Sequence, residues 1–517
     1  MDWHEGYVAN IDYEVGFFPE QSPVHLNFVC ILNGVEPVPL DCPFSYFELG
    51  SGQGFTSNLL AAANPQGRFY AADFNPAHVA ASAQLAQAAE LDNMVFLEAS
   101  FADLADGSVD LPQFDFITLH GVYSWVNAEN RAHIMRFIAR YLKPGGIAHI
   151  SYNAMPGWTS TLPLQRLILE HVDLYPSGPQ EQIRQMRLLL DALVQNKAGY
   201  LTSNAGMLGH YLKIAQHEQR SGYLAHEFMN QGWQPLYHAD VARAGASAKL
   251  EYVGSAGLAW AFPELSLSAD QRLLLDGVAD PILRETLKDY LKNTCFREDV
   301  YVRGARRMSA GRRDQWLAKI GLALPVRRET VEFKPDTSFS QLTPDGAFFD
   351  ALLDVLAEGP KTLLDLASLP LMAGKNLAEI ARIAAVLVVA TPAKIYFLSG
   401  AGQDVAPARR LNNVIADNQW QTKKYQMFAA PLLGTAVAAP LCQRLVYRTL
   451  SSPTAASQDI TAITAQVWQR MQEQYETIHV NDREVPLDDS VLVEVRKSVD
   501  TIVELGSPIW RKLQMLP

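Results

Sequence analysis

One short segment, from Glu48 to Gly54 (sequence ELGSGQG), constrains the fold of this 517-residue chain more than any other feature. It places three glycines at alternate positions, between an apolar run at 44–49 and an amphipathic stretch at 56–63. Glycine permits left-handed backbone conformations and close approach by a ligand. The N-terminus of a following helix offers free N–H groups to that ligand. The segment therefore predicts a strand, a ligand-binding turn and a helix.

The rest of the first 160 residues continues this alternation. Further strands are expected at 68–73, 94–98, 114–120 and 147–152, with helices at 76–91 and 129–142. Short apolar runs that alternate with amphipathic helices are typical of a parallel, doubly wound sheet. We therefore predict an α/β fold with a Rossmann-like domain over residues 1–160.

The remaining chain is long enough for two more domains. Residues 161–333 are predicted to form a mainly helical middle domain, with helices at 162–171, 180–196, 269–278 and 281–293 and one short strand at 251–254. A polar stretch with two prolines at 334–344 suggests a linker. Residues 334–517 are then predicted to be a C-terminal α+β domain. It would hold a winged-helix-like part (helices 346–358, 362–367 and 377–388, strand 393–398) and a tail with helices at 459–477 and 489–505.

Composition excludes several classes of protein. The net charge of −12 argues against broad binding to nucleic acid. No apolar run is long enough to span a membrane and no signal peptide begins the chain, so we expect a cytoplasmic protein without membrane insertion. The four cysteines are widely scattered, and no Cys/His spacing indicates a metal.

Three features of the glycine turn favour S-adenosylmethionine (AdoMet) over NAD or FAD. Glu48 stands two positions before the first glycine, where it could face the amino group of the methionine moiety. The spacing is G-x-G-x-G, not the G-x-G-x-x-G expected around a pyrophosphate. Asp73 ends the next strand, where it could accept hydrogen bonds from the ribose hydroxyls. The turn therefore predicts a cofactor site made of Glu48, Gly50, Ser51, Gly52, Gly54, Asp73 and Phe74.

Several motifs together resemble a known family. Residues 47–54, 69–73, 120–125 and 142–146 look like class I AdoMet-dependent methyltransferases. The segments 120–126 and 151–158 are more narrowly similar to methyltransferases that carry a methyltransferase regulatory domain, a group that includes rickettsial-type protein lysine methyltransferases. Segments 223–228, 252–255, 280–286 and 296–304 resemble that regulatory domain. The resemblance implies S-adenosylhomocysteine (AdoHcy) as product, a protein lysine as acceptor, and a middle domain used for homodimerisation or docking.

The chain departs from this family at two places. Where the family often has an acidic residue near the adenine, this chain has Ser100, followed by Phe101. The segment 18–25 resembles the family's N-terminal lid motif but lacks its central histidine, which leaves Tyr13, Glu20 and Gln21 as lid candidates.

Candidates for the acceptor site follow the fourth and fifth strands, at the ligand edge of such a sheet. Aromatic rings there could bind an ammonium group by cation–π contacts, although packing is the common role of such rings. An asparagine could accept a hydrogen bond from the amine or simply stabilise a turn. A histidine could contact the methionine moiety, relay a proton or be structural. The candidates are His120, Tyr123, Trp125 and Asn153 for catalysis, and Tyr123, Trp125, Tyr152, Asn153 and Trp158 for acceptor binding.

The leading interpretation is an AdoMet-dependent methyltransferase acting on lysine side chains of a protein. Two alternatives stay open: a small-molecule O- or N-methyltransferase, and a regulatory protein that binds AdoMet without catalysis. No Asn/Asp-Pro-Pro-Tyr motif follows the fourth strand, which disfavours nucleic-acid and glutamine acceptors. The winged-helix-like part is acidic rather than basic, so it favours protein contacts over DNA.

Overall fold

The computed structural model describes residues 15–175, 178–206, 208–209, 228–334, 346–398, 404–417, 425–452, 459–474, 477–480 and 483–517. Tyr13 and most of the predicted linker lie outside these ranges, as does nearly all of the 223–228 segment.

A seven-stranded mixed sheet organises the chain, in the order β3-β2-β1-β4-β5-β7-β6. Five strands are mutually parallel and match the predicted Rossmann-like pattern: β1 (Phe44–Leu49), β2 (Gly67–Asp73), β3 (Met94–Glu98), β4 (Phe114–Leu119) and β5 (Leu142–Asn153). β7 (Phe296–Arg303) is antiparallel to both of its neighbours, β5 and β6 (Leu250–Ser255).

The last two strands come from the region predicted as a separate middle domain, so the boundary predicted at residue 160 cuts through this sheet. β6 was expected as a strand and β7 was not. In its sequence FREDVYVR, three consecutive charged residues follow Phe296 and hide the pattern of a buried strand. Two of them are paired: the Arg297 guanidinium lies 2.7 Å from a carboxylate oxygen of Asp289 and 2.9 Å from one of Asp299.

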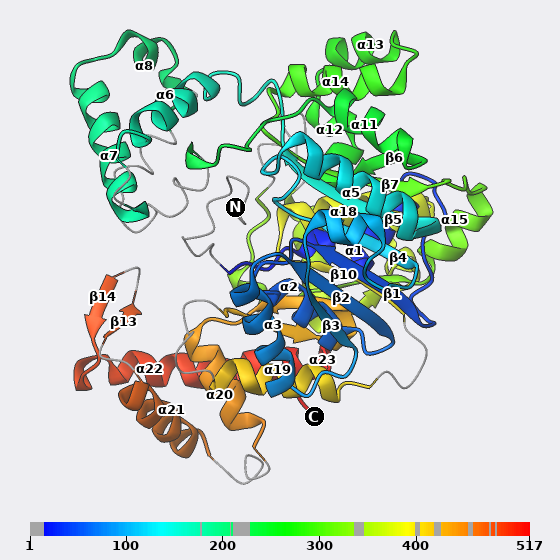
Figure 1. The fold of residues 1–517 in the computed structure, drawn as a ribbon. Helices are drawn as coiled ribbons and strands as arrows, with labels where there is room; N and C mark the ends of the chain where they lie inside the picture. The colour runs from blue at the N-terminus through cyan, green and yellow to red at the C-terminus, as the bar shows by residue number, and fades with distance from the viewer. Residues whose placement is uncertain are drawn as a thin grey trace.

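Helices cover both faces of the sheet (Figure 1). One face packs against α1 (Pro23–Leu32). The same apolar core continues beyond α1 into three helices of the C-terminal region, α16 (Gly346–Glu358), α17 (Leu363–Ala367) and α18 (Leu377–Ala390). The other face packs against α4 (Phe101–Asp106), α5 (Ala128–Tyr141) and α11 (His238–Ser247). α2 (Phe55–Ala63) and α3 (Pro76–Ala88) contribute side chains to a third core shared with the C-terminal tail.

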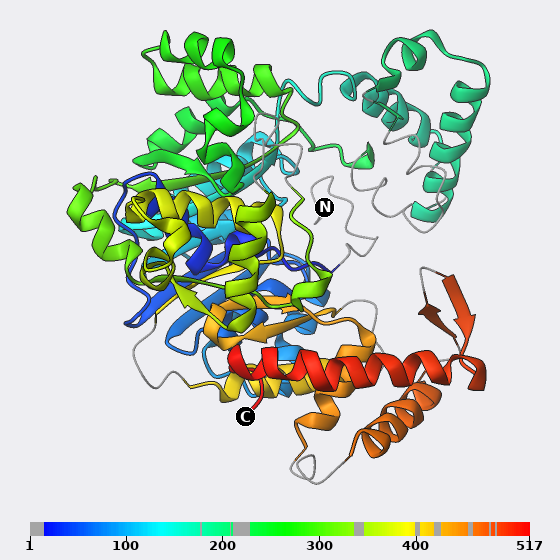
Figure 2. The ribbon, with the colours of Figure 1, turned by 180° about the vertical axis from the view of Figure 1, so that it is seen from behind.

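The described residues between β5 and β7 lie mainly in helices. α6 (Leu162–Val172), α7 (Pro179–Gln195) and α8 (Gly199–Ser203) form a lobe with its own small core, which includes Leu164, Ile168, Met186 and Phe228. This helical lobe projects from the sheet in both views (Figures 1 and 2). α12 (Pro263–Ser266), α13 (Ala269–Asp276) and α14 (Pro281–Lys292) lie near β6 and β7 instead.

The predicted helices and strand of the winged-helix-like part are present as α16, α17, α18 and β10 (Lys394–Phe397). β10 joins β8 (Ile320–Ala323) and β9 (Lys361–Thr362) in a small sheet of order β10-β8-β9. α15 (Ala310–Leu317) precedes β8. The winged-helix comparison itself stays a prediction.

The C-terminal tail wraps around α2 and α3. It contains α19 (Ala406–Asp417), the hairpin β11 (Met427–Ala430) to β12 (Thr435–Ala438), α20 (Leu441–Leu450) and α21 (Ile460–Gln474), followed by the hairpin β13 (Thr477–Val480) to β14 (Arg483–Pro486), α22 (Asp489–Thr501) and α23 (Ser507–Lys512). The amide of Asn64, at the end of α2, donates a 2.9 Å hydrogen bond to the Gly434 carbonyl. α21, α22 and the β13–β14 hairpin form an arm that projects on the same side as the helical lobe (Figure 2).

Among the described residues, no helix combines the length and the apolar composition needed to cross a membrane.

Candidate active site

A cavity of about 480 Å³ lies at the carboxyl ends of β1, β2, β4 and β5. That volume lies within the range of small-molecule and cofactor sites. The cavity brings together most of the residues that the sequence singled out: Glu48, Gly50, Ser51, Gly52, Gly54, Asp73, Phe74, Ser100, Phe101, His120, Trp125, Asn153 and Trp158.

The glycine turn forms one wall of this cavity, and its conformation explains its sequence. Gly50, Gly52 and Gly54 have φ angles of +65°, +54° and +63°, in the left-handed region that side chains disfavour. A Cβ atom on Gly50 would lie 2.6 Å from the Cγ2 atom of Val122. The turn is therefore open to a ligand on one side and tightly packed on the other.

Asp73 holds the turn in place from the end of β2. The Gly52 N–H donates a 2.8 Å hydrogen bond to one carboxylate oxygen of Asp73, and the Asn75 N–H donates a 2.9 Å bond to the other. The imidazole of His78 lies 3.3 Å from the same carboxylate. Asp73 thus both shapes the turn and presents its remaining lone pairs to the cavity.

Glu48 is nearly fully buried under the N-terminal segment. The Gln21 side-chain amide donates a 3.1 Å hydrogen bond to one carboxylate oxygen, and the Ser57 hydroxyl donates to the other. Burial outweighs these bonds and raises the pKa of Glu48 to about 7. A positively charged ligand group beside Glu48 would favour its ionised form.

The side of the cavity expected for adenine is lined by Phe74, Ser100 and Phe101. The Ser100 hydroxyl is already engaged, because it donates a 2.7 Å hydrogen bond to Asp103 and accepts one from the Asp103 N–H as the N-cap of α4. Ser100 therefore lines this wall by van der Waals contact, because its hydroxyl is already hydrogen-bonded within the helix cap.

At the other side, the cavity is lined by Trp125, Asn153, Trp158 and Phe296. The Trp158 indole N–H donates a 2.6 Å hydrogen bond to the Cys295 carbonyl, which fixes the ring against β7. The Asn153 side chain is 5% exposed, and its Nδ2 atom has no hydrogen-bond partner. This wall is therefore aromatic, with one buried amide available to a ligand.

Two of the predicted acceptor-site residues do not line this cavity. Tyr152 is fully buried, and its hydroxyl donates a 2.7 Å hydrogen bond to Asp299, because successive side chains of a strand point to opposite faces. Tyr123 is 3% exposed and lines a different cavity, between α5 and α11. The structure does not bring either side chain to the predicted site, and Tyr13 lies outside the described residues.

His120 follows the last residue of β4 and lines the cavity. The Gly121 N–H donates a 2.7 Å hydrogen bond to the Ser151 hydroxyl, which ties this turn to β5. The His120 ring stacks on Phe18, with ring centroids 3.9 Å apart. Burial lowers the pKa of His120 to about 4, so the ring is neutral at physiological pH.

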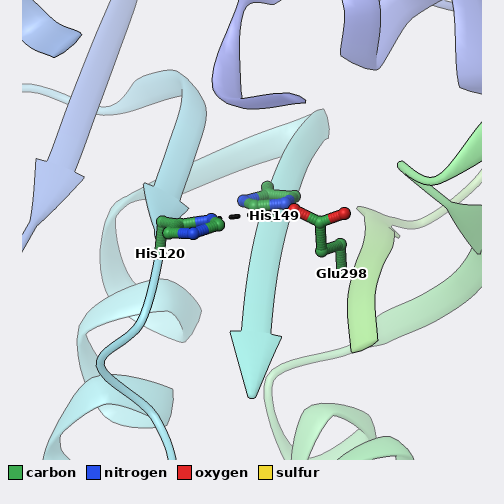
Figure 3. Close-up of side chains that lie close together, drawn as sticks. All are labelled: His120, His149 and Glu298. Atoms are coloured by element: carbon green, nitrogen blue, oxygen red, sulfur yellow. Dashed lines mark ion pairs between the residues drawn. The ribbon is translucent and has the colours of Figure 1, made fainter. Parts of the chain in front are cut away.

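Two further polar residues, His149 and Glu298, lie beside His120 and were not predicted (Figure 3). His149 comes from β5 and Glu298 from β7, the next two strands of the sheet. The His120 Nδ1 atom is 3.7 Å from a Glu298 carboxylate oxygen. In the described part of the chain these are the three side chains close enough to share a metal ion. Burial raises the pKa of Glu298 to about 8, however, and so favours the protonated form, which binds metal poorly.

Comparison with known proteins identifies the family of this chain. Residues 47–148 match the family described as "Methyltransferase domain", and residues 220–303 match "Predicted methyltransferase regulatory domain". The chain is 32% identical over 451 residues to the uncharacterized protein sll1526 of Synechocystis, covering 86% of this chain and 88% of that protein. It is 31% identical over 235 residues to the uncharacterized protein RP789 of Rickettsia prowazekii, covering 43% and 41% of the two chains.

Among solved structures, PKMT2 from Rickettsia typhi, in complex with AdoHcy, has the same fold. The TM-score is 0.69 at 20% identity, covering 97% of this chain and 99% of that one. The site fits the cofactor AdoMet, whose product is AdoHcy: the glycine turn leaves room for a ligand beside the backbone, and Asp73 and Glu48 can bind its polar groups. This chain therefore belongs to the family of AdoMet-dependent methyltransferases that carry a methyltransferase regulatory domain.

Proposed function

We propose that the protein transfers the methyl group of AdoMet to lysine side chains of a protein. The observation that carries this proposal is that the cavity that holds the glycine turn is also lined by Trp125, Trp158, Phe296 and the buried amide of Asn153. Aromatic faces attract an ammonium group, by about 0.5–2 kcal/mol each, and an amide oxygen accepts its hydrogen bond. Because the oxygen and nitrogen of an Asn amide are assigned from their partners, and the Nδ2 position of Asn153 has none, an amine would fix the orientation of this amide.

The surroundings of these side chains suit a neutral amine. A lysine must lose a proton before it can attack the methyl group, and a desolvated apolar site lowers its pKa. Within the proposal, Glu48 and Asp73 bind the two ends of the cofactor, and Asn153 with Trp125 orients the acceptor nitrogen. AdoMet supplies an activated methyl group on a sulfonium.

A protein acceptor also fits the shape of the molecule. The helical lobe and the arm of α21, α22 and the β13–β14 hairpin both project from the sheet on one side (Figure 1). The net charge of −12 favours a basic segment over an acidic one. The similarity to PKMT2 and the family resemblance point in the same direction. From the family resemblance we also propose that residues 161–333 provide a surface for docking the protein substrate or for homodimerisation.

The test is to incubate the full chain with isotopically labelled AdoMet and a cell lysate, and then to locate the label by mass spectrometry. Label on lysines of proteins is the expected result. Label confined to small molecules would instead establish small-molecule methylation, and binding of AdoMet without any transfer would contradict both. The Asp73→Asn variant serves as the background control, since it should bind AdoMet weakly.

A further inference from the structure

The three side chains His120, His149 and Glu298 form a buried polar cluster that the cofactor site leaves unexplained. His149 and Glu298 lie on the neighbouring strands β5 and β7, His120 directly follows β4, and the three side chains lie close together (Figure 3). His149 is fully buried, and neither of its ring nitrogens has a hydrogen-bond partner. The buried Nδ1 atom of His120 also lacks one. Leaving such atoms unpaired costs about 1–3 kcal/mol each, so a purely structural role is unfavourable.

The cluster borders the AdoMet cavity through His120. His120 and Phe296 line that cavity, and their ring centroids lie 5.7 Å apart in an edge-to-face contact. A second cavity, of about 290 Å³, is lined by Glu20, His25 and Lys394. Glu20 is close enough to Glu298 to affect its pKa, and His25 is close enough to affect that of His149.

Methylation of an amine requires an exit for one proton, and the cavity walls contain few groups that can take it. Glu48 and Asp73 are engaged with the glycine turn and its surroundings. Glu298 is different, because its carboxyl group can accept a proton whenever it is ionised. Its neighbours are His120 from the end of β4, His149 from β5, Glu20 from the N-terminal segment, and Asp299 on its own strand. None of these neighbours is a permanent cation, which would lower the pKa of Glu298 and make it a weaker proton acceptor.

We propose that Glu298, acting through His120, accepts the proton that an amine acceptor loses in the AdoMet cavity, and passes it toward Glu20 and His25 at the second cavity. This inference rests on the proposed amine acceptor. One N–H bond of the acceptor ammonium breaks, and its electron pair stays on nitrogen and forms the new N–C bond. The electron pair of the cleaved C–S bond stays on sulfur. The released proton enters one ring nitrogen of His120 while the other ring nitrogen gives its proton to the Glu298 carboxylate.

The 3.7 Å separation of His120 and Glu298 is compatible with this role, because such contacts are often long without substrate and shorten in the complex, or contain one water. A neutral His120 can exchange protons between its two nitrogens without becoming a stable cation. Burial and Glu20 raise the pKa of Glu298 to about 8, so only a part of the Glu298 side chains is ionised near neutral pH. That ionised form is a stronger base than an ordinary carboxylate, and it is the form that accepts the proton.

The first experiment needs no acceptor. Infrared spectra of the wild-type enzyme with AdoHcy, compared with the Glu298→Gln variant between pH 6 and pH 10, should show one protonated-carboxyl band that the variant lacks. That band should disappear as the pH rises through about 8. A wild-type spectrum equal to that of the variant would overturn the proposal. Zinc bound by the wild type at one ion per chain and lost in Glu298→Gln would also overturn it, since Glu298 would then be a ligand.

The second experiment measures single-turnover methyl transfer to the labelled lysines against pH. Glu298→Gln should be slower by about 100-fold at pH 7.5. The deficit should shrink toward pH 10, where the lysine loses its proton to water unaided. Glu298→Asp, which keeps a carboxylate, should restore part of the rate. A deficit that is the same at every pH would indicate a structural role and contradict the proposal.

Controls separate this inference from the proposed function. Glu251→Gln changes a half-exposed glutamate of the neighbouring strand β6, which is paired with Arg307, and should transfer methyl groups at the wild-type rate. Calorimetry should give unchanged AdoMet affinity for both glutamine variants. If the wild type labels no lysine at all, the proposed function fails, and the infrared experiment still decides whether Glu298 holds the proton.

Discussion

The ring of Phe18 stacks on the imidazole of His120, with centroids 3.9 Å apart and planes inclined by 22°. This contact joins the N-terminal segment to the end of β4 at the wall of the AdoMet cavity, which both residues line. The Phe18 N–H also donates a 3.3 Å hydrogen bond to the Thr56 hydroxyl at the start of α2. The segment before α1 is therefore a wall of the site, and its ring fixes the orientation of His120.

Removing this ring should weaken cofactor binding. Phe18→Ala deletes the stacking contact, worth about 1 kcal/mol, and should raise the Kd for AdoMet roughly 5-fold by calorimetry. Phe18→Tyr keeps the ring and should bind like the wild type. Equal affinity of the alanine variant and the wild type would show that the stack does not support the site.

Asp73 should be a major determinant of AdoMet affinity. Asp73→Asn removes a charge that accepts hydrogen bonds from Gly52 and Asn75 and is placed to bind the ribose. Hydrogen bonds to charged groups contribute about 1.5–3 kcal/mol, so the Kd should rise about 10- to 100-fold. Glu98→Gln is the matched control, because Glu98 pairs with Asp73 in the sheet but is exposed. Unchanged affinity for Asp73→Asn would refute its assignment.

The glycine turn offers a comparison between two positions with similar backbone strain. Gly52 has a φ of +54° with open space where a Cβ would lie, whereas a Cβ on Gly50 would meet Val122 at 2.6 Å. Gly52→Ala should therefore lower the folding stability only by the cost of placing a residue with a Cβ in a left-handed conformation, about 1–2 kcal/mol. Gly50→Ala should cost more, and adding Val122→Ala should recover part of the loss. Denaturant unfolding measures all three, and equal losses for the two single variants would contradict the packing argument.

AdoMet binding should depend on pH through Glu48. Its pKa is raised to about 7, so the carboxyl is mostly protonated at pH 6 and mostly ionised at pH 8. The amino group of the cofactor is positive and favours the ionised form, so affinity should increase about 10-fold from pH 6 to pH 8. In Glu48→Gln the affinity should be lower at pH 8 and nearly constant over this range. A wild-type affinity that falls with rising pH would contradict the assignment.

The cofactor half of the site could be predicted because its signals are local. The glycines, Glu48 and Asp73 lie within one strand–turn–helix–strand unit, and their spacing alone restricts the backbone. The five parallel strands were predictable for the same reason, since each is a short apolar run. These are the parts of the fold that the structure confirms most directly.

The residues near the proposed acceptor site could not be predicted from the sequence, because only the three-dimensional fold brings them together. His149 and Glu298 are separated by almost 150 residues and meet only because β7 pairs with β5. Glu298 also lies in a charged stretch that does not look like a buried strand in the sequence. The stretch can be buried because Arg297 and Asp299 pair with residues of other elements, which the sequence does not reveal. Tyr152 was misplaced because the sequence does not show which face of β5 looks toward the cavity.

Trp125 and Tyr123 give the sharpest test of where the acceptor binds. They are two residues apart, and both were predicted to line the acceptor site, but only Trp125 lines the AdoMet cavity. If Trp125 holds an ammonium group, Trp125→Ala should lower the rate of methyl transfer by up to about 30-fold, which corresponds to a cation–π contact of about 2 kcal/mol. Trp125→Phe should lose less, and the AdoMet Kd should change little in either. Tyr123→Phe should keep the wild-type rate, because its side chain lies in the cavity between α5 and α11. A slow Tyr123→Phe beside a normal Trp125→Ala would place the acceptor on the other face of this loop and overturn the assignment of the aromatic wall.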